Sequence, residues 1–114
     1  MKENPTANQS SAQVITQIVF KNISAAGADE YVGIYNAGND KNLMNWTITV
    51  DNKTNYVLPY INFPALDSVK IHFGNGTRNL TDIYLNKSSN VLNDTHGDVK
   101  LIDSSGNWVS EVRY

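Results

Sequence analysis

The chain has 114 residues, 40% of them hydrophobic and 10% aromatic, which is typical of one globular domain with its own core rather than of a disordered segment. Its 9 basic and 11 acidic residues are interspersed and give a net charge of −2, which disfavours a surface built for nucleic acid or anionic lipid. The chain has no cysteine, which excludes disulfides, thiolate metal sites and cysteine nucleophiles, and no apolar run of the roughly 18 residues that a membrane span needs.

The first 13 residues are polar and lack the apolar middle of a signal peptide. We expect residues 1–13 to be a linker or the cut edge of a longer protein, and residues 14–114 to form one domain. The β-branched run over residues 14–20 predicts the first strand, and residues 21–29 predict a loop.

Residues 30–48 have the pattern of a strand, a tight turn and a second strand. Side chains alternate from residue 31 to residue 36 with the period of an extended chain. Residues 36–40 are Asn-Ala-Gly-Asn-Asp, which favour a turn because glycine and asparagine tolerate positive φ. Trp46, Ile48 and Val50 then alternate with polar residues, as in a strand with one buried face.

The remaining chain predicts further short strands separated by turns. We expect them at residues 56–58, 68–73, 83–85, 98–102 and 108–114, with hairpin connections at residues 51–55 and 103–107. Pro59 and Pro64 bracket an irregular crossing. Because at least seven short strands occur and no helical repeat of apolar residues does, the sequence predicts an all-β sandwich or barrel.

The order of these features resembles the lamin-tail domain. The residues that carry the resemblance are Glu30-Tyr31-Val32, Asn36, Leu43 and Trp46, then Leu58-Pro59, Leu66, Val69 to Gly76, Asn93, Gly97-Asp98, Leu101, Asp103 and Gly106. Gly33 and Asp67 depart from the pattern. The resemblance implies an immunoglobulin-like β-sandwich of about seven to nine antiparallel strands. With it we expect a core that contains Val32, Ile34, Trp46, Ile48, Val69, Ile71 and Leu101.

The tripeptide Asn-x-Ser/Thr, the acceptor of N-glycosylation, occurs eight times. It begins at Asn8, Asn22, Asn45, Asn52, Asn75, Asn79, Asn86 and Asn93. The chain has 16 asparagines and 17 serines and threonines, so random placement gives only about two such tripeptides. Clustering of these residues in turns is one explanation, and a glycosylated outer surface is the other. We take Asn22, Asn52, Asn75, Asn79, Asn86 and Asn93 as possible glycosylation sites, whereas Asn45 faces outward only if Trp46 faces inward.

The polar residues do not form a motif for catalysis. We expect His72 to face solvent, and His96 to lie in a polar turn over residues 93–98 that lacks the spacing of a calcium loop. Asp29-Glu30 with Asn39-Asp40 is a weaker candidate for calcium, and solvated turns explain these residues better. No nucleophile elbow or phosphate loop is present, so we expect no enzyme activity, cofactor or bound metal.

Aromatic residues offer a second kind of site. Five tyrosines would suit a sugar or a protein if they converged on one face: Tyr31, Tyr35, Tyr56, Tyr60 and Tyr84. For Trp46 the sequence favours the core, and Trp108 follows a turn and is open to either role.

These features suggest a non-catalytic module that binds a protein or a cell-surface glycan in an extracellular or envelope protein. The lamin-tail resemblance implies such a role, since the family's domains are interaction modules, and many sequons without a cysteine suggest an archaeal cell surface. The alternative is a nucleic-acid-binding accessory domain beside a nuclease, and a calcium-dependent adhesion domain is a third possibility.

Overall fold

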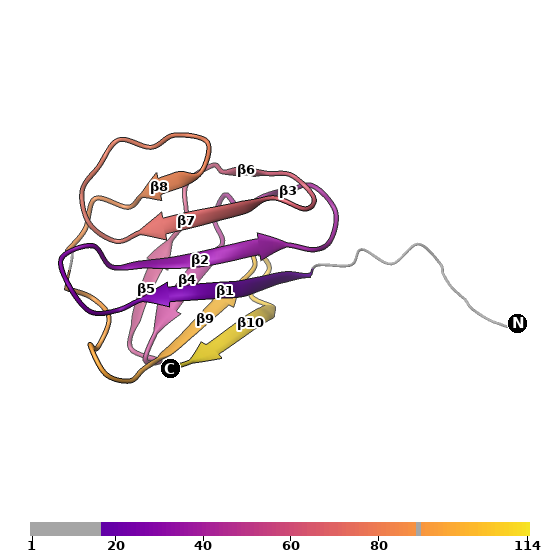
Figure 1. Ribbon diagram of the computed structural model, residues 1–114. Coiled ribbons are helices and arrows are strands. Elements are labelled where there is room, and N and C mark those ends of the chain that lie inside the picture. Colours follow the sequence, from indigo (N-terminus) through magenta and orange to yellow (C-terminus); the bar gives the residue numbers. More distant parts are fainter. Residues whose placement is uncertain (1–16, 89) are drawn as a thin grey trace, which may run out of the picture.

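The computed structural model describes residues 17–88 and 90–114, and these residues form ten strands without a helix. The strands are β1 (Ile18–Ser24), β2 (Tyr31–Asn36), β3 (Lys41–Asn42), β4 (Thr47–Val50), β5 (Thr54–Val57), β6 (Asn62–Phe63), β7 (Ser68–His72), β8 (Asp82–Tyr84), β9 (Asp98–Ile102) and β10 (Trp108–Arg113). They build one sheet in the order β1-β2-β7-β8, a second in the order β10-β9-β4-β5, and a small ribbon of β3 and β6. Figure 1 shows the first sheet in front of the second, which confirms the predicted all-β sandwich.

The core lies between the two four-stranded sheets. Alternate residues of each strand point into this space, so Val32 and Ile34 of β2 face Ile48 of β4 across it. All seven residues expected in the core are buried: Val32, Ile34, Trp46, Ile48, Val69, Ile71 and Leu101. Burial of apolar area, at about 25 cal/mol per Å², is therefore the main force that holds the sheets together.

The beginning of the domain differs from the sequence prediction. Residues 14–16 lie outside the described part, and β1 continues through Ser24, into the segment that we expected to be a loop. Its register against β2 shifts between Phe20 and Asn22, so Lys21 is an extra residue in a β-bulge. The bulge breaks the alternation of polar and apolar residues. For this reason the sequence pattern did not predict the second half of β1 as a strand.

One pair of neighbouring strands is parallel, although the sequence predicted antiparallel strands. β7 and β8 run in the same direction, with Ile71 opposite Ile83, because residues 73–81 carry the chain back along the sheet before β8 begins. All other strand pairs are antiparallel. Strand direction depends on this return path, which side-chain alternation does not encode.

The turn after β2 is held by a buried asparagine. The carboxamide of Asn36 donates to the carbonyls of Asn39, at 2.7 Å, and Phe63, at 3.0 Å. Its oxygen accepts from the backbone N–H of Gly38 at 2.9 Å. Asn36 thus ties the turn to β6, and the polar side chain is buried without loss of hydrogen bonds.

Candidate interaction face

The outer face of the β1-β2-β7-β8 sheet gathers aromatic, basic and acidic side chains from four strands. We define this outer face by the residues that point away from the core: Val19, Lys21, Asn22, Ser24, Tyr31, Gly33, Tyr35, Ser68, Lys70, His72, Asp82 and Tyr84. They come from segments far apart in the chain, and the period of two along each strand puts them on one side. The sheet pairing then places them in cross-strand rows.

One row consists of Tyr31, His72 and Tyr84 on three adjacent strands. The imidazole of His72 stacks on the ring of Tyr84, with centroids 4.3 Å apart and an interplanar angle of 14°, and lies 5.2 Å from the ring of Tyr31. These neighbours leave His72 only 4% exposed. The expectation that His72 faces solvent was therefore wrong: its side of the sheet is the outer one, but its neighbours cover it.

Two carboxylates hold the imidazole of His72 in place. Its Nδ1 lies 2.8 Å from Oδ1 of Asp29, and its Nε2 lies 2.7 Å from Oδ1 of Asp82. Each ring nitrogen of His72 therefore lies within hydrogen-bonding distance of a carboxylate oxygen, which fixes the orientation of the ring. The hydrogen bond from His72 lowers the pKa of Asp82, and a second one from the Thr81 hydroxyl lowers it further.

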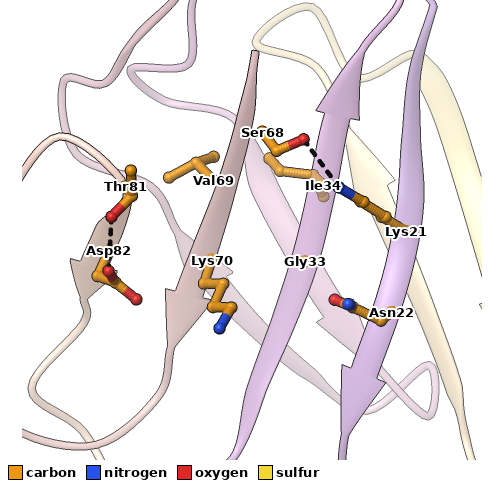
Figure 2. A pocket seen from close by; sticks show the side chains of 9 residues that line it. All are labelled: Lys21, Asn22, Gly33, Ile34, Ser68, Val69, Lys70, Thr81 and Asp82. Carbon is orange, nitrogen blue, oxygen red and sulfur yellow. Dashed lines mark hydrogen bonds between the residues drawn. The ribbon is translucent and has the colours of Figure 1, made fainter.

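A groove of about 280 Å³ opens beside this row, above Gly33. Figure 2 shows Asn22 and Lys70 on either side of Gly33, and Lys21 reaching over to Ser68, whose hydroxyl oxygen lies 3.3 Å from the lysine Nζ. A Cβ atom at position 33 would clash with Oδ1 of Asn22. A larger residue at position 33 would therefore require the exposed side chain of Asn22 to turn away.

Only some of the aromatic candidates converge. Tyr31, Tyr35 and Tyr84 share the outer face, and the Nζ of Lys70 lies 4.9 Å above the ring of Tyr31. The remaining two tyrosines lie elsewhere: Tyr56 packs edge-on against the core residue Phe73, and Tyr60 is exposed in the segment after β5.

The two tryptophans have opposite surroundings. Trp46 is 5% exposed and belongs to the core, whereas Trp108 is 61% exposed at the start of β10. The Nζ of Lys100 lies 4.7 Å above the ring of Trp108, a cation–π contact at the surface of the other sheet.

Sequence reasoning did not identify the role of Glu30. Its carboxylate is buried, and Oε1 accepts from the backbone N–H groups of Val91, at 2.6 Å, and Leu92, at 2.8 Å. The residue therefore anchors the connection between β8 and β9 to the start of β2. The only signal in the sequence was an acidic residue directly before an apolar strand.

The sequon asparagines are all at the surface in the described part of the chain. These are Asn22, Asn45, Asn52, Asn75, Asn79, Asn86 and Asn93, whereas Asn8 lies outside the described residues. Asn45 is exposed while Trp46 is buried, so the condition for its accessibility is met. The seven side chains thus have the exposure that a glycan acceptor needs, but a glycan on Asn22 would fill the groove above Gly33.

The acidic residues considered for calcium are engaged separately. Asp29 bonds to His72, Glu30 to the 91–92 backbone, and Asp40 accepts from the N–H of Ala65 at 2.8 Å. Across residues 17–88 and 90–114, no group of three or more acidic or histidine residues is arranged to hold a metal ion. Over the same residues there is no helix of the length and hydropathy needed to cross a membrane.

Comparison of the chain with models of known protein families finds no match, and no curated protein matches it either.

Proposed function

We propose that this domain is a non-catalytic interaction module of an extracellular or cell-envelope protein, and that its outer face binds a cell-surface glycan or a protein. The observation that carries the proposal is the groove above Gly33, with two lysines and three tyrosines on the same face. Such a face offers flat aromatic rings, hydrogen-bond donors and positive charge together. The resemblance to lamin-tail domains supports the same role.

The covered histidine of this face, His72, is suited to a structural role in binding rather than to catalysis. His72 is covered, and each of its nitrogens lies within hydrogen-bonding distance of a carboxylate, so it has no free nitrogen to act as a general base on a ligand. The network instead fixes the positions of Tyr31 and Tyr84. A rigid face of this kind binds with little loss of conformational entropy.

Binding is tested with arrays of neutral and acidic oligosaccharides and with isolated cell envelopes. We expect Lys70→Gln to weaken binding because it removes a positive charge beside the groove, while Lys53→Gln, in the turn before β5, leaves binding unchanged. The proposal for this face is wrong if no probe binds, or if both variants bind as well as the original chain.

The proposed location has its own test. The seven exposed sequons support a glycosylated surface protein. Mass spectrometry of the native protein should find glycans on several of them, and fractionation should place the protein in the envelope or outside the cell. Unmodified sequons together with a cytosolic protein would contradict this location.

A nucleic-acid-binding role is the second candidate, favoured by Lys21 and Lys70 beside the tyrosines on one face. Two phosphate contacts give a slope of only about −2 for log affinity against log salt concentration. DNA binding at micromolar concentration that disappears in the double variant Lys21→Gln, Lys70→Gln would support this role over a glycan or protein ligand.

A further inference from the structure

The sandwich has two sides at which edge strands of the two sheets meet. On one side β1 and β10 lie next to each other (Figure 1). On the other side β5 and β8 form the walls of a groove of about 740 Å³, lined by residues 55–59 and 84–87. This β5–β8 groove lies at the side of the sandwich, and of the residues that line it only Tyr84 also belongs to the outer face described above.

The edge of β8 is blocked in part by its own chain. The backbone N–H of Asp82 donates to the side-chain oxygen of Asn79 at 2.9 Å, and the carbonyl of Asp82 accepts from the N–H of Asn79 at 2.9 Å. This turn occupies the outward backbone groups of Asp82, the first residue of β8, and so protects the beginning of this edge.

The edge of β5 is open. The N–H of Leu58 donates to the carbonyl of Trp46 at 2.7 Å, and in an antiparallel pair every second residue bonds in the same direction. Asn55 and Val57 therefore point their N–H and C=O groups away from β4. Within residues 17–88 and 90–114 no backbone group pairs with these four outward groups. β5 also contains no proline, charged residue or bulge, which are the usual protections of an edge strand.

The side chains along the groove indicate what an added strand would contact. Tyr56 and Leu85 are partly buried against the core from the two opposite walls, so a strand beside β5 would place alternate side chains between them. Val57 is 63% exposed and offers further apolar surface. The partner strand thus needs apolar residues at every second position.

The charged residues near the groove indicate the sign of the partner's charge. Lys87 is the one charged residue among those that line the groove, and the exposed Lys53 directly precedes β5. A second copy of this chain paired through β5 would bring no acidic residue on that strand, because β5 is Thr-Asn-Tyr-Val, whereas an acidic peptide would neutralise the lysines.

We propose that β5 binds an extended acidic peptide, with apolar residues at alternate positions, as an added antiparallel or parallel strand. β5 has four residues, so at about 3.3 Å per residue the shared ladder is only about 13 Å long. Up to four backbone hydrogen bonds form with Asn55 and Val57, and contacts with Tyr56 and Leu85 select the apolar side chains.

The test uses the isotope-labelled chain and a seven-residue peptide of alternating valine and threonine with an acidic residue at each end. We expect the amides of Asn55 and Val57 to shift and to become protected from hydrogen exchange, while the amide of Lys70 on the outer face does not change. Two isomers of the peptide carry N-methyl groups on alternate amides. The isomer methylated on the amides that face β5 should lose about fivefold in affinity for each lost bond, and the other isomer should bind like the parent peptide.

Val57→Pro removes one outward N–H without removing a bond to β4, and Val57→Thr is its matched control because it keeps that N–H and the branched Cβ. We expect about fivefold weaker binding for the proline variant only. The proposal is overturned if millimolar peptide leaves both amides unprotected, or if the two methylated isomers bind equally. It is also overturned if the chain alone forms a dimer that protects the same amides, because the occupant is then a second copy. Since Lys70→Gln should leave peptide binding intact, failure here is distinguishable from failure of the outer face.

Discussion

The Nε2 atom of His72 and the Oδ1 atom of Asp82 lie 2.7 Å apart on neighbouring parallel strands. This bond joins the short edge strand β8 to β7 through side chains as well as through the backbone. With Asp29 on the other nitrogen, it also connects the loop before β2 to the same point. The outer face therefore depends on a charge network that spans three segments of the chain.

We predict that Asp82→Asn lowers the free energy of unfolding by about 1 kcal/mol at pH 7, because an amide oxygen is a weaker hydrogen-bond acceptor for the His72 ring than a carboxylate oxygen is. The folded-state pKa of Asp82 is lowered. Its contribution is therefore complete above the unfolded pKa, near ~4, and is lost as the pH falls through the folded pKa. Urea titrations at pH 7, 5 and 3 should show the difference between variant and original chain shrinking at the lowest pH. Asp94→Asn, an exposed control, should show no such trend.

Glu30→Ala is expected to destabilise the domain by about 2 to 4 kcal/mol, because it leaves the N–H groups of Val91 and Leu92 without an acceptor in a buried position. Glu30→Gln keeps one side-chain oxygen and should cost less. Urea denaturation measures both losses, and hydrogen exchange at the amides of Val91 and Leu92 locates them. Equal losses in the two variants would contradict the role of the acceptor oxygen.

Leu66 has a φ of +66° and is 73% exposed, so its backbone is strained and its side chain gains little from burial. We predict that Leu66→Asn stabilises the domain by about 0.5 to 1 kcal/mol, since asparagine tolerates this conformation better. The melting temperature should rise by a few degrees. Leu80→Asn, which changes a 94% exposed leucine without positive φ, is the matched control and should have no effect.

The two tryptophans should be separable by fluorescence. Trp108→Phe is expected to leave stability within about 0.5 kcal/mol and to remove the emission that acrylamide quenches easily, because Trp108 is exposed. The remaining emission should be blue-shifted and resist quenching, as expected for the buried Trp46. Trp46→Phe should instead destabilise the domain measurably by leaving space in the core. Easy quenching of the Trp46 emission would contradict its burial.

Alternation along the chain was sufficient to predict much of the fold. Val32, Ile34, Ile48, Val69 and Ile71 repeat with a period of two, and this period alone assigns them to the inner faces of a sandwich. The turn over residues 36–40 was also predictable from the sequence, because asparagine and glycine favour its backbone conformation. These are local properties, determined by residues a few positions apart.

The candidate sites depended on tertiary structure. The period of two says on which side of a strand His72 lies, but its carboxylate partners are 43 and 10 residues away and meet it only because of how the strands pair. In the same way, the parallel direction of β8 and the open edge of β5 follow from the order of strands in the sheets. Residue type and spacing along one strand do not predict which distant strands become its neighbours in a sheet. The covered histidine, the groove above Gly33 and the β5–β8 groove are consequences of that pairing.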